Sequence, residues 1–209
     1  MRMAELSRVS GVSVPTIKYY QREGLLPTGE LSTPNQAQYG EAHVRRLALI
    51  RSLLEVGGLS IAEVGVVLSV IDTPGRPTHH ILGATVHALT PAGRGEEAGE
   101  EYKQAIDDLI ARRGWRVDRS NPAHAVAAGV LARFDQLGQR QIFDAVDAYS
   151  RAAEVIAEAD LAAVAATEGR DARAETALLG TVLGDVLIGA LRRLAQEDVS
   201  AKQFPPPPK

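Results

Sequence analysis

The first two dozen residues constrain the fold most, because their apolar pattern fits two short helices joined by a tight turn. Residues 3–10 repeat apolar side chains at helical spacing, and Gly11 then interrupts the repeat. Ser13 is a suitable N-cap for a second helix over 14–23. Two short helices joined by a turn that contains glycine form a helix-turn-helix.

The second helix of such a pair is the one that meets DNA. In a helix-turn-helix its first residues contact base edges, while basic and aromatic side chains further along it contact phosphates. By this pattern Val14, Pro15 and Thr16 would face base edges, and Lys18 would face a phosphate. The full set of DNA-contacting residues predicted here is Ser13, Val14, Pro15, Thr16, Lys18, Tyr19, Tyr20 and Arg22.

The stretch from 27 to 39 predicts a β-hairpin held out to solvent. It is rich in Gly, Pro, Ser, Thr and Asn and has little apolar periodicity. A plain surface loop would have the same composition, but a hairpin directly behind a helix-turn-helix favours a DNA-contacting wing. Its predicted contact residues are Asn35, Gln36, Gln38 and Tyr39.

A third helix is expected from Glu41, with Leu47 and Leu54 facing the core. Arg45 and Arg46 lie off that face. Two adjacent arginines are most often only solvated charges. A capping box of Ser60 and Glu63 then begins a fourth helix that runs to about residue 71.

Seven motifs follow one another in order over residues 3–71: Met3-Ala4-Glu5-Leu6, Gly11-Val12-Ser13, Thr16-Ile17-Lys18-Tyr19-Tyr20, Arg22-Glu23-Gly24-Leu25-Leu26-Pro27, Asn35-Gln36-Ala37-Gln38-Tyr39, Val44-Arg45-Arg46-Leu47 and Gly57-Gly58-Leu59-Ser60-Ile61-Ala62-Glu63-Val64. Their order resembles the head of the MerR family of transcription regulators. One departure is Gln38, which stands where that family's wing usually carries an arginine. The resemblance implies that Arg45 and Arg46 contact phosphates beside the wing.

The resemblance also implies a function. Two heads of a homodimer would bind a palindromic operator in double-stranded promoter DNA, bend and untwist it, and so realign the promoter for RNA polymerase. A small-molecule or protein effector would modulate this. Two alternatives stay open: a simple repressor or architectural protein with a purely dimerising bundle, and a binding protein that sequesters an effector.

Composition limits the chemistry. The 209 residues carry a net charge of −3, with +2 over residues 1–60 (seven Lys or Arg against five Glu) and therefore −5 over the rest. The chain has no cysteine, so thiolate metal or redox sensing is excluded, and no cofactor or metal is predicted. His79, His80 and His87 lack a third ligand nearby and are read as surface or packing residues. With no leader sequence or membrane span expected, a cytoplasmic protein is predicted.

The predicted fold is mostly α, with a winged helix-turn-helix followed by an all-helical bundle. We divide the chain into a DNA-binding domain over 1–72, a short helix and linker over 73–95, and a helical effector or dimerisation domain over 96–198. A disordered Pro-rich tail over 199–209 would follow. Residues 77–90 give one helix of about three turns, too short for the long coiled coil that usually follows the family's head.

The helical domain has no motif of an enzyme: it lacks a nucleophile elbow, a phosphate-binding glycine loop and a His-Glu metal motif. Its large rings could line a pocket for an apolar effector, although any single ring is more often ordinary core. The predicted effector residues are Trp115, Phe134, Phe143 and Tyr149.

The last helix, predicted over 172–196, is apolar nearly all round and must be covered on more than one side. It is judged too short and, with Asp185, too polar for a membrane span. Two glycines four residues apart would allow another helix to approach closely. A dimer is favoured over the central helix of a monomeric bundle because a protein that reads a palindrome must be two-fold symmetric, and because Pro91 cuts short the coil that usually supplies this symmetry. The predicted dimerisation residues are Leu179, Gly180, Leu183, Gly184 and Leu187.

Overall fold

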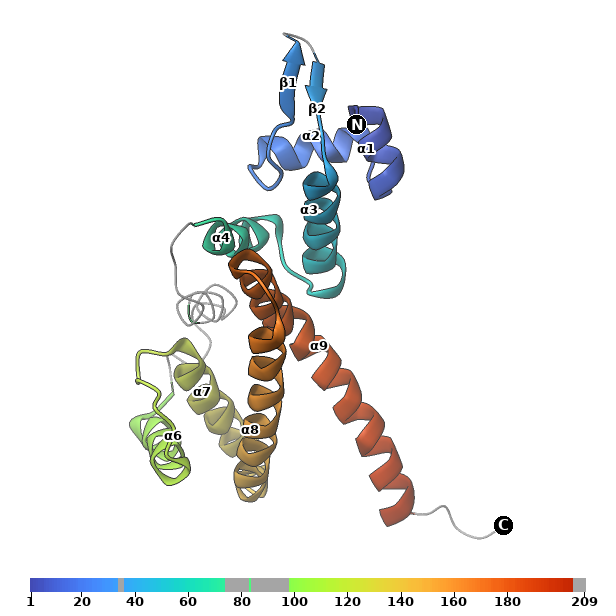
Figure 1. The fold of residues 1–209 in the computed structure, drawn as a ribbon. Helices are drawn as coiled ribbons and strands as arrows, with labels where there is room; N and C mark the ends of the chain where they lie inside the picture. Colours follow the sequence, from blue (N-terminus) through green and yellow to red (C-terminus); the bar gives the residue numbers. More distant parts are fainter. Residues whose placement is uncertain (34–35, 74–82, 84–97, 205–209) are drawn as a thin grey trace, which may run out of the picture. The chain divides into compact units, whose positions relative to one another are not determined.

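The computed structural model describes residues 1–33, 36–73, 83 and 98–204, and this part of the chain is mostly helical (Figure 1). One antiparallel hairpin interrupts the helices, which confirms the predicted fold class. The elements are α1 (Met3–Ser10), α2 (Val14–Arg22), β1 (Glu30–Thr33), β2 (Gln36–Gln38), α3 (Glu41–Arg51), the π-helical turn η1 (Ser52–Val56), α4 (Ile61–Asp72), α6 (Glu100–Arg113), α7 (Pro122–Gln136), α8 (Ile142–Ala166) and α9 (Arg170–Gln203).

The chain divides into two compact units. One comprises residues 1–73 together with 179–209, and the other comprises residues 74–178. The sequence-based division placed all of the last helix in the second domain, whereas α9 belongs to both units. Apart from residue 83, the helix predicted over 77–90 lies outside the described residues, as do its three histidines and the expected boundary between residues 95 and 96.

In the first unit the predicted turn and caps are present. Gly11 has a φ of 69°, a left-handed conformation that a residue with a Cβ adopts only with strain. The Oγ of Ser13 accepts a hydrogen bond from the backbone N–H of Thr16 at 3.2 Å, which caps α2. Ser60 and Glu63 form the predicted capping box of α4. The turn and both caps are therefore local features that the sequence encodes directly.

The core of the head is made of aliphatic side chains from α1 to α4. Because each helix is short, burial against the others rather than helix propensity holds it in place. The fully buried members are Leu6, Ile17, Leu25, Leu26, Leu47, Ile50, Leu53, Val64, Val67 and Leu68.

The hairpin pairs β1 with β2, with a register irregularity between Leu31 and Thr33. A Cβ on Gly29 would lie 2.5 Å from the backbone oxygen of Gln38, so only glycine fits where the hairpin begins. Tyr39, at its end, donates its backbone N–H to the carbonyl of Met1 at 2.8 Å. The base of the hairpin is thus fixed to the N-terminus of the head.

In the second unit α6 packs against α7 around Ile106, Ala128 and Leu131. The Tyr102 hydroxyl donates to Asp135 at 2.5 Å across the same pair of helices. α6 ends at Gly114 and the chain after α7 turns at Gly138, as predicted. Both glycines have left-handed φ values, 67° and 70°, which stop a helix without steric strain.

α9 is longer than the sequence pattern indicated. It extends to Gln203, so the prediction of an extended tail from residue 199 is wrong for residues 199–203. With 34 residues, α9 is also long enough to cross a membrane, and an 18-residue segment of it is apolar enough to do so. Of that segment, 22% is buried. The expectation that this helix is too short for a span is therefore wrong. Alanine, lysine and glutamine after residue 199 favour helix and explain the extension.

Candidate nucleic-acid interface

One face of α2 is exposed along its whole length. Pro15, Lys18, Tyr19 and Arg22 are spaced by three, one and three residues, so they share this face, and all four are exposed. Ile17 lies on the opposite side and is completely buried. The head therefore presents a polar and basic stripe on α2 while the other side of the helix forms core.

Within this stripe the Arg22 guanidinium lies 5.9 Å from the centre of the Tyr19 ring. A cation over an aromatic face is attracted by the ring quadrupole, which limits the range of positions the arginine samples. The stripe thus carries two positive charges: one on the exposed Lys18, and one on Arg22, which lies over the Tyr19 ring.

At the N-terminus of α2 the Thr16 hydroxyl lies 2.7 Å from the Ser13 hydroxyl. The polar atoms of both residues therefore already interact with each other, and Ser13 also caps the helix. Base contacts from this end would come from Pro15, which is exposed, from the half-buried Val14 and from the methyl group of Thr16.

Two of the residues predicted to contact DNA are instead core residues. Tyr20 and Tyr39 are 7% and 6% exposed. The Tyr39 hydroxyl is 3.4 Å from Gln21 Nε2, and the Tyr39 ring packs edge-on against His43. Burial also raises the pKa of the Tyr20 hydroxyl. Both rings pack in the core behind the helix and the hairpin, and direct contact of these side chains with DNA stays a prediction.

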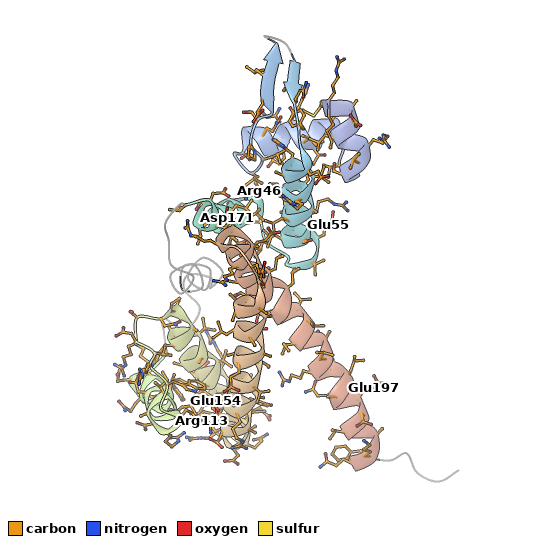
Figure 2. The ribbon with its side chains drawn as sticks, in the orientation of Figure 1. Arg46, Glu55, Arg113, Glu154, Asp171 and Glu197 are labelled. Atoms are coloured by element: carbon orange, nitrogen blue, oxygen red, sulfur yellow. The ribbon has the colours of Figure 1, made fainter. Side chains whose placement is uncertain are left out.

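The two adjacent arginines of α3 have different surroundings. Arg45 is exposed. The Arg46 side chain is only 13% exposed: its Nε donates to the Leu25 carbonyl at 2.9 Å, and its two terminal nitrogens donate to both carboxylate oxygens of Asp72, at the end of α4 (Figure 2). Arg46 thus joins α4 to the turn that follows α2. Of the pair, Arg45 remains the one with a charge directed to solvent.

The hairpin contributes fewer assignable contacts. Gln38 is exposed, Asn35 lies outside the described residues, and the Gln36 side chain is not described. Leu31, which the sequence reasoning missed, is 73% exposed on β1. Its signal was a lone large apolar residue in an otherwise polar hairpin. Such a side chain can contact the apolar part of a nucleic-acid groove.

The four rings predicted to line an effector pocket have different roles. Phe143 packs against the core shared by α6 and α7, and the Arg140 guanidinium lies 5.8 Å from its ring centre. The Trp115 indole donates its Nε1–H to Glu154 at 2.7 Å. Tyr149 is exposed and Phe134 is half-buried. Phe143 is therefore a packing residue, and a common pocket for all four rings stays a prediction.

Glu154 on α8 also accepts a hydrogen bond from Arg113, the last residue of α6 (Figure 2). The distance from Arg113 Nε to Glu154 Oε1 is 3.0 Å. The Arg113 hydrogen bond, and after it that of Trp115, holds the pKa of Glu154 below its ordinary value. A carboxylate with a lowered folded pKa stabilises the fold above its unfolded pKa, and this contribution is lost as the pH falls through the folded pKa.

Glu154→Gln is accordingly expected to reduce the loss of stability on acidification from about pH 5 to about pH 3, since glutamine does not titrate there. Trp115 is the only tryptophan, so its fluorescence during urea unfolding reports on this site. Glu158→Gln, an exposed position one turn further along α8, is the control. An unchanged pH dependence in Glu154→Gln would contradict the assignment.

Residues predicted for dimerisation lie along α9. Leu179 and Leu183 are half-buried, while Leu187 is exposed. A Cβ built on Gly180 or Gly184 meets no atom within 4 Å, so space is open beside both. Both glycines are half-buried, and dimerisation through them stays a prediction.

Three comparisons with known proteins agree with this geometry. Residues 1–70 match the model of the MerR HTH family regulatory proteins. The mercuric resistance operon regulatory protein of Bacillus cereus is 35% identical over 111 residues, which are 53% of this chain and 83% of that protein. Its counterpart from Serratia marcescens is 36% identical over 66 residues, 32% of this chain and 45% of that protein.

A solved structure from Streptomyces coelicolor A3(2), described as that of a candidate transcriptional regulator, is similar over the whole length of both chains. Its TM-score is 0.73 and its sequence identity is 31%. The similarity therefore includes the helical region beyond the head. Family model, relatives and fold lead to one conclusion: this chain belongs to the MerR family of regulatory proteins.

Proposed function

We propose that this protein binds an operator in double-stranded promoter DNA as a homodimer and regulates transcription by distorting that DNA. The observation that carries the proposal is the exposed stripe of Pro15, Lys18, Tyr19 and Arg22 on α2. A recognition helix needs such a face because phosphate contacts supply affinity while base edges supply specificity.

A homodimer follows from the reading of a palindrome, because the two half-sites are related by two-fold symmetry. Two heads on one face of the duplex would bend and untwist the spacer, at a cost of several kcal/mol that additional phosphate contacts offset. RNA polymerase would then engage the realigned promoter. The protein makes and breaks no covalent bond in this mechanism, so it is proposed to act without catalysis.

The second unit would sense an effector. Its helices carry the Trp115–Glu154–Arg113 cluster, and Tyr149 is exposed on α8, the helix that carries Glu154. A ligand that binds only one conformation shifts the population of that conformation. Without cysteine in the chain, the effector is proposed to be an organic molecule or a protein rather than a thiolate-bound metal.

Selection from a random library of DNA duplexes, followed by fluorescence anisotropy, tests the proposal. We expect enrichment of an inverted repeat, and Thr16→Ala should lower the ratio of specific to non-specific affinity about tenfold, the usual cost of one base contact. Ser69→Ala removes an exposed hydroxyl on α4 and serves as the control. Recovery of no common sequence by the wild-type protein would refute the proposed function.

A further inference from the structure

The hairpin of the head presents one large apolar side chain to solvent. Leu31 on β1 is 73% exposed, and no large apolar side chain in the described part of the chain is more exposed. A single exposed leucine is common on protein surfaces, so exposure alone does not indicate a role. A role is indicated here by the place at which the hairpin holds Leu31 and by the residues around it.

The hairpin that carries Leu31 is attached to α2 at both of its ends. Gln21 on α2 places its Nε2 3.3 Å from the carbonyl oxygen of Pro27, before β1, and 3.4 Å from the hydroxyl of Tyr39, after β2. Met1 and Tyr39 also exchange two backbone hydrogen bonds, of 2.7 and 2.8 Å. Because Leu31 follows Pro27 by only four residues, these contacts hold it at a defined position relative to α2.

The two faces of the hairpin differ in charge. In an antiparallel pair, residues opposite each other share a face, and neighbours along one strand lie on opposite faces. Leu31 is opposite Ala37, whereas Glu30 is opposite Gln38. One face thus carries a leucine beside a small alanine, and the other carries the only charged residue of the segment 27–40. Leu31 therefore extends beyond its cross-strand neighbour from an uncharged face.

The pairing of the two strands becomes irregular directly after Leu31. Leu31 pairs with Ala37 and Thr33 pairs with Gln36, so the register shifts between Leu31 and Thr33. Such a bulge bends the strand and changes the direction of the side chains beside it, and bulges are frequent next to functional sites. The bulge thus gives Leu31 a direction that a regular strand would not.

The charge of the hairpin limits which part of DNA it can contact. The segment 27–40 contains no lysine, arginine or histidine, and its one charge, on Glu30, is negative. It therefore cannot neutralise a phosphate, and a phosphate repels Glu30. The apolar face can instead enter a groove and contact sugars and base edges. With α2 in the major groove, the hairpin attached to it reaches the adjacent minor groove.

We propose that Leu31 enters the minor groove beside each half-site as an apolar wedge that partly unstacks one base step, with Glu30 and Gln38 on the face turned away; this inference rests on the operator binding of the proposed function. Leucine is among the side chains that open base steps from the minor groove and kink the duplex. Pyrimidine–purine steps unstack most easily, so the wedge selects such a step. Leu31 thereby adds specificity outside the bases that α2 contacts.

Affinity and salt dependence on the duplex selected by the wild-type protein test the wedge. Leu31→Ala should raise the dissociation constant about tenfold, the effect of cutting back a buried leucine side chain, and leave the slope of log affinity against log salt unchanged. Leu137→Ala is the matched control, because Leu137, which follows α7, is 71% exposed. It should bind like the wild type. An unchanged urea midpoint should show that Leu31→Ala keeps the fold.

Exchange of a DNA step tests where Leu31 makes contact. The pyrimidine–purine step beside each half-site is replaced by a purine–purine step, which should weaken binding of the wild-type protein about fivefold or more. Leu31→Ala should bind the two duplexes equally, because the side chain that opens the step is absent. The fluorescence of 2-aminopurine placed in the step should rise on binding of the wild type and stay unchanged with Leu31→Ala.

Four results would overturn the wedge: wild-type affinity of Leu31→Ala, a loss of affinity that accompanies a lowered urea midpoint, the same step preference in both proteins, and selection of operators without a pyrimidine–purine step beside the half-sites. Failure of the proposed function gives a different result. If the wild-type protein selects no sequence, operator binding itself is refuted. If it selects an operator that Leu31→Ala binds as tightly, only the wedge is refuted.

Discussion

Ile17→Ala is expected to lower the free energy of unfolding of the head by about 2–5 kcal/mol, the range for truncating a buried aliphatic side chain. Ile17 is completely buried on the inner face of α2, and the short helices of the head depend on mutual burial. A loss of this size approaches the whole stability of a small domain. DNA binding should be lost together with the fold. Urea unfolding followed by circular dichroism measures the change.

Lys18→Ala, at the next position, is the contrasting control because Lys18 is exposed on the outer face of the same helix. It should leave the urea midpoint unchanged and weaken binding similarly on all DNA sequences. The slope of log affinity against log salt should fall by about 0.9, the value for one phosphate contact. A shifted base preference with an unchanged salt slope would show that Lys18 reads bases.

Arg46→Ala is expected to destabilise the head by about 2 kcal/mol, because it removes a charged donor from the Leu25 carbonyl and from Asp72. The Asp72 part contributes little, since that carboxylate is 55% exposed and screened by water. Arg46→Lys should recover only a part, because an ammonium group cannot reproduce the three hydrogen bonds of the guanidinium. Urea midpoints of the two variants give this comparison.

Arg45→Ala should behave in the opposite way. Arg45 is exposed, so its loss should leave stability unchanged, while the salt slope of DNA binding falls by about 0.9. The resemblance to the family implied the same phosphate contact for both arginines. If Arg46→Ala changed only the salt slope and left the urea midpoint as in the wild type, the assignment of Arg46 to fold stability and of Arg45 to phosphate contact would be wrong.

Sequence reasoning located the head because its signals are local. The left-handed Gly11, the Ser13 cap and the Ser60–Glu63 capping box each involve residues at most three positions apart. Such features are encoded in the side chains themselves and need no distant partner to form. The helix-stopping glycines Gly114 and Gly138 belong to the same class.

Whether a residue of the head faces the core or the solvent could not be predicted in the same way. Tyr20 and Tyr39 belong to motifs of a DNA-binding family, yet both are buried, because one face of α2 and the end of the hairpin must close over the core. Arg46 looks identical to Arg45 in sequence. Its partners, Leu25 and Asp72, are 21 and 26 residues away, so only the tertiary structure brings them to it.

By itself, the sequence determined the order of helices, the caps and turns that bound them, and the family of the head, because short-range backbone and side-chain preferences decide these. The tertiary structure decided which face of each helix is buried and which is left exposed. It buried Ile17 and left Lys18 in solvent, and it fixed Val182 against Gly57 while leaving Leu191 exposed. The physical reason is that burial is a property of the assembled core, and a periodic apolar pattern does not say which of two apolar faces the core will cover.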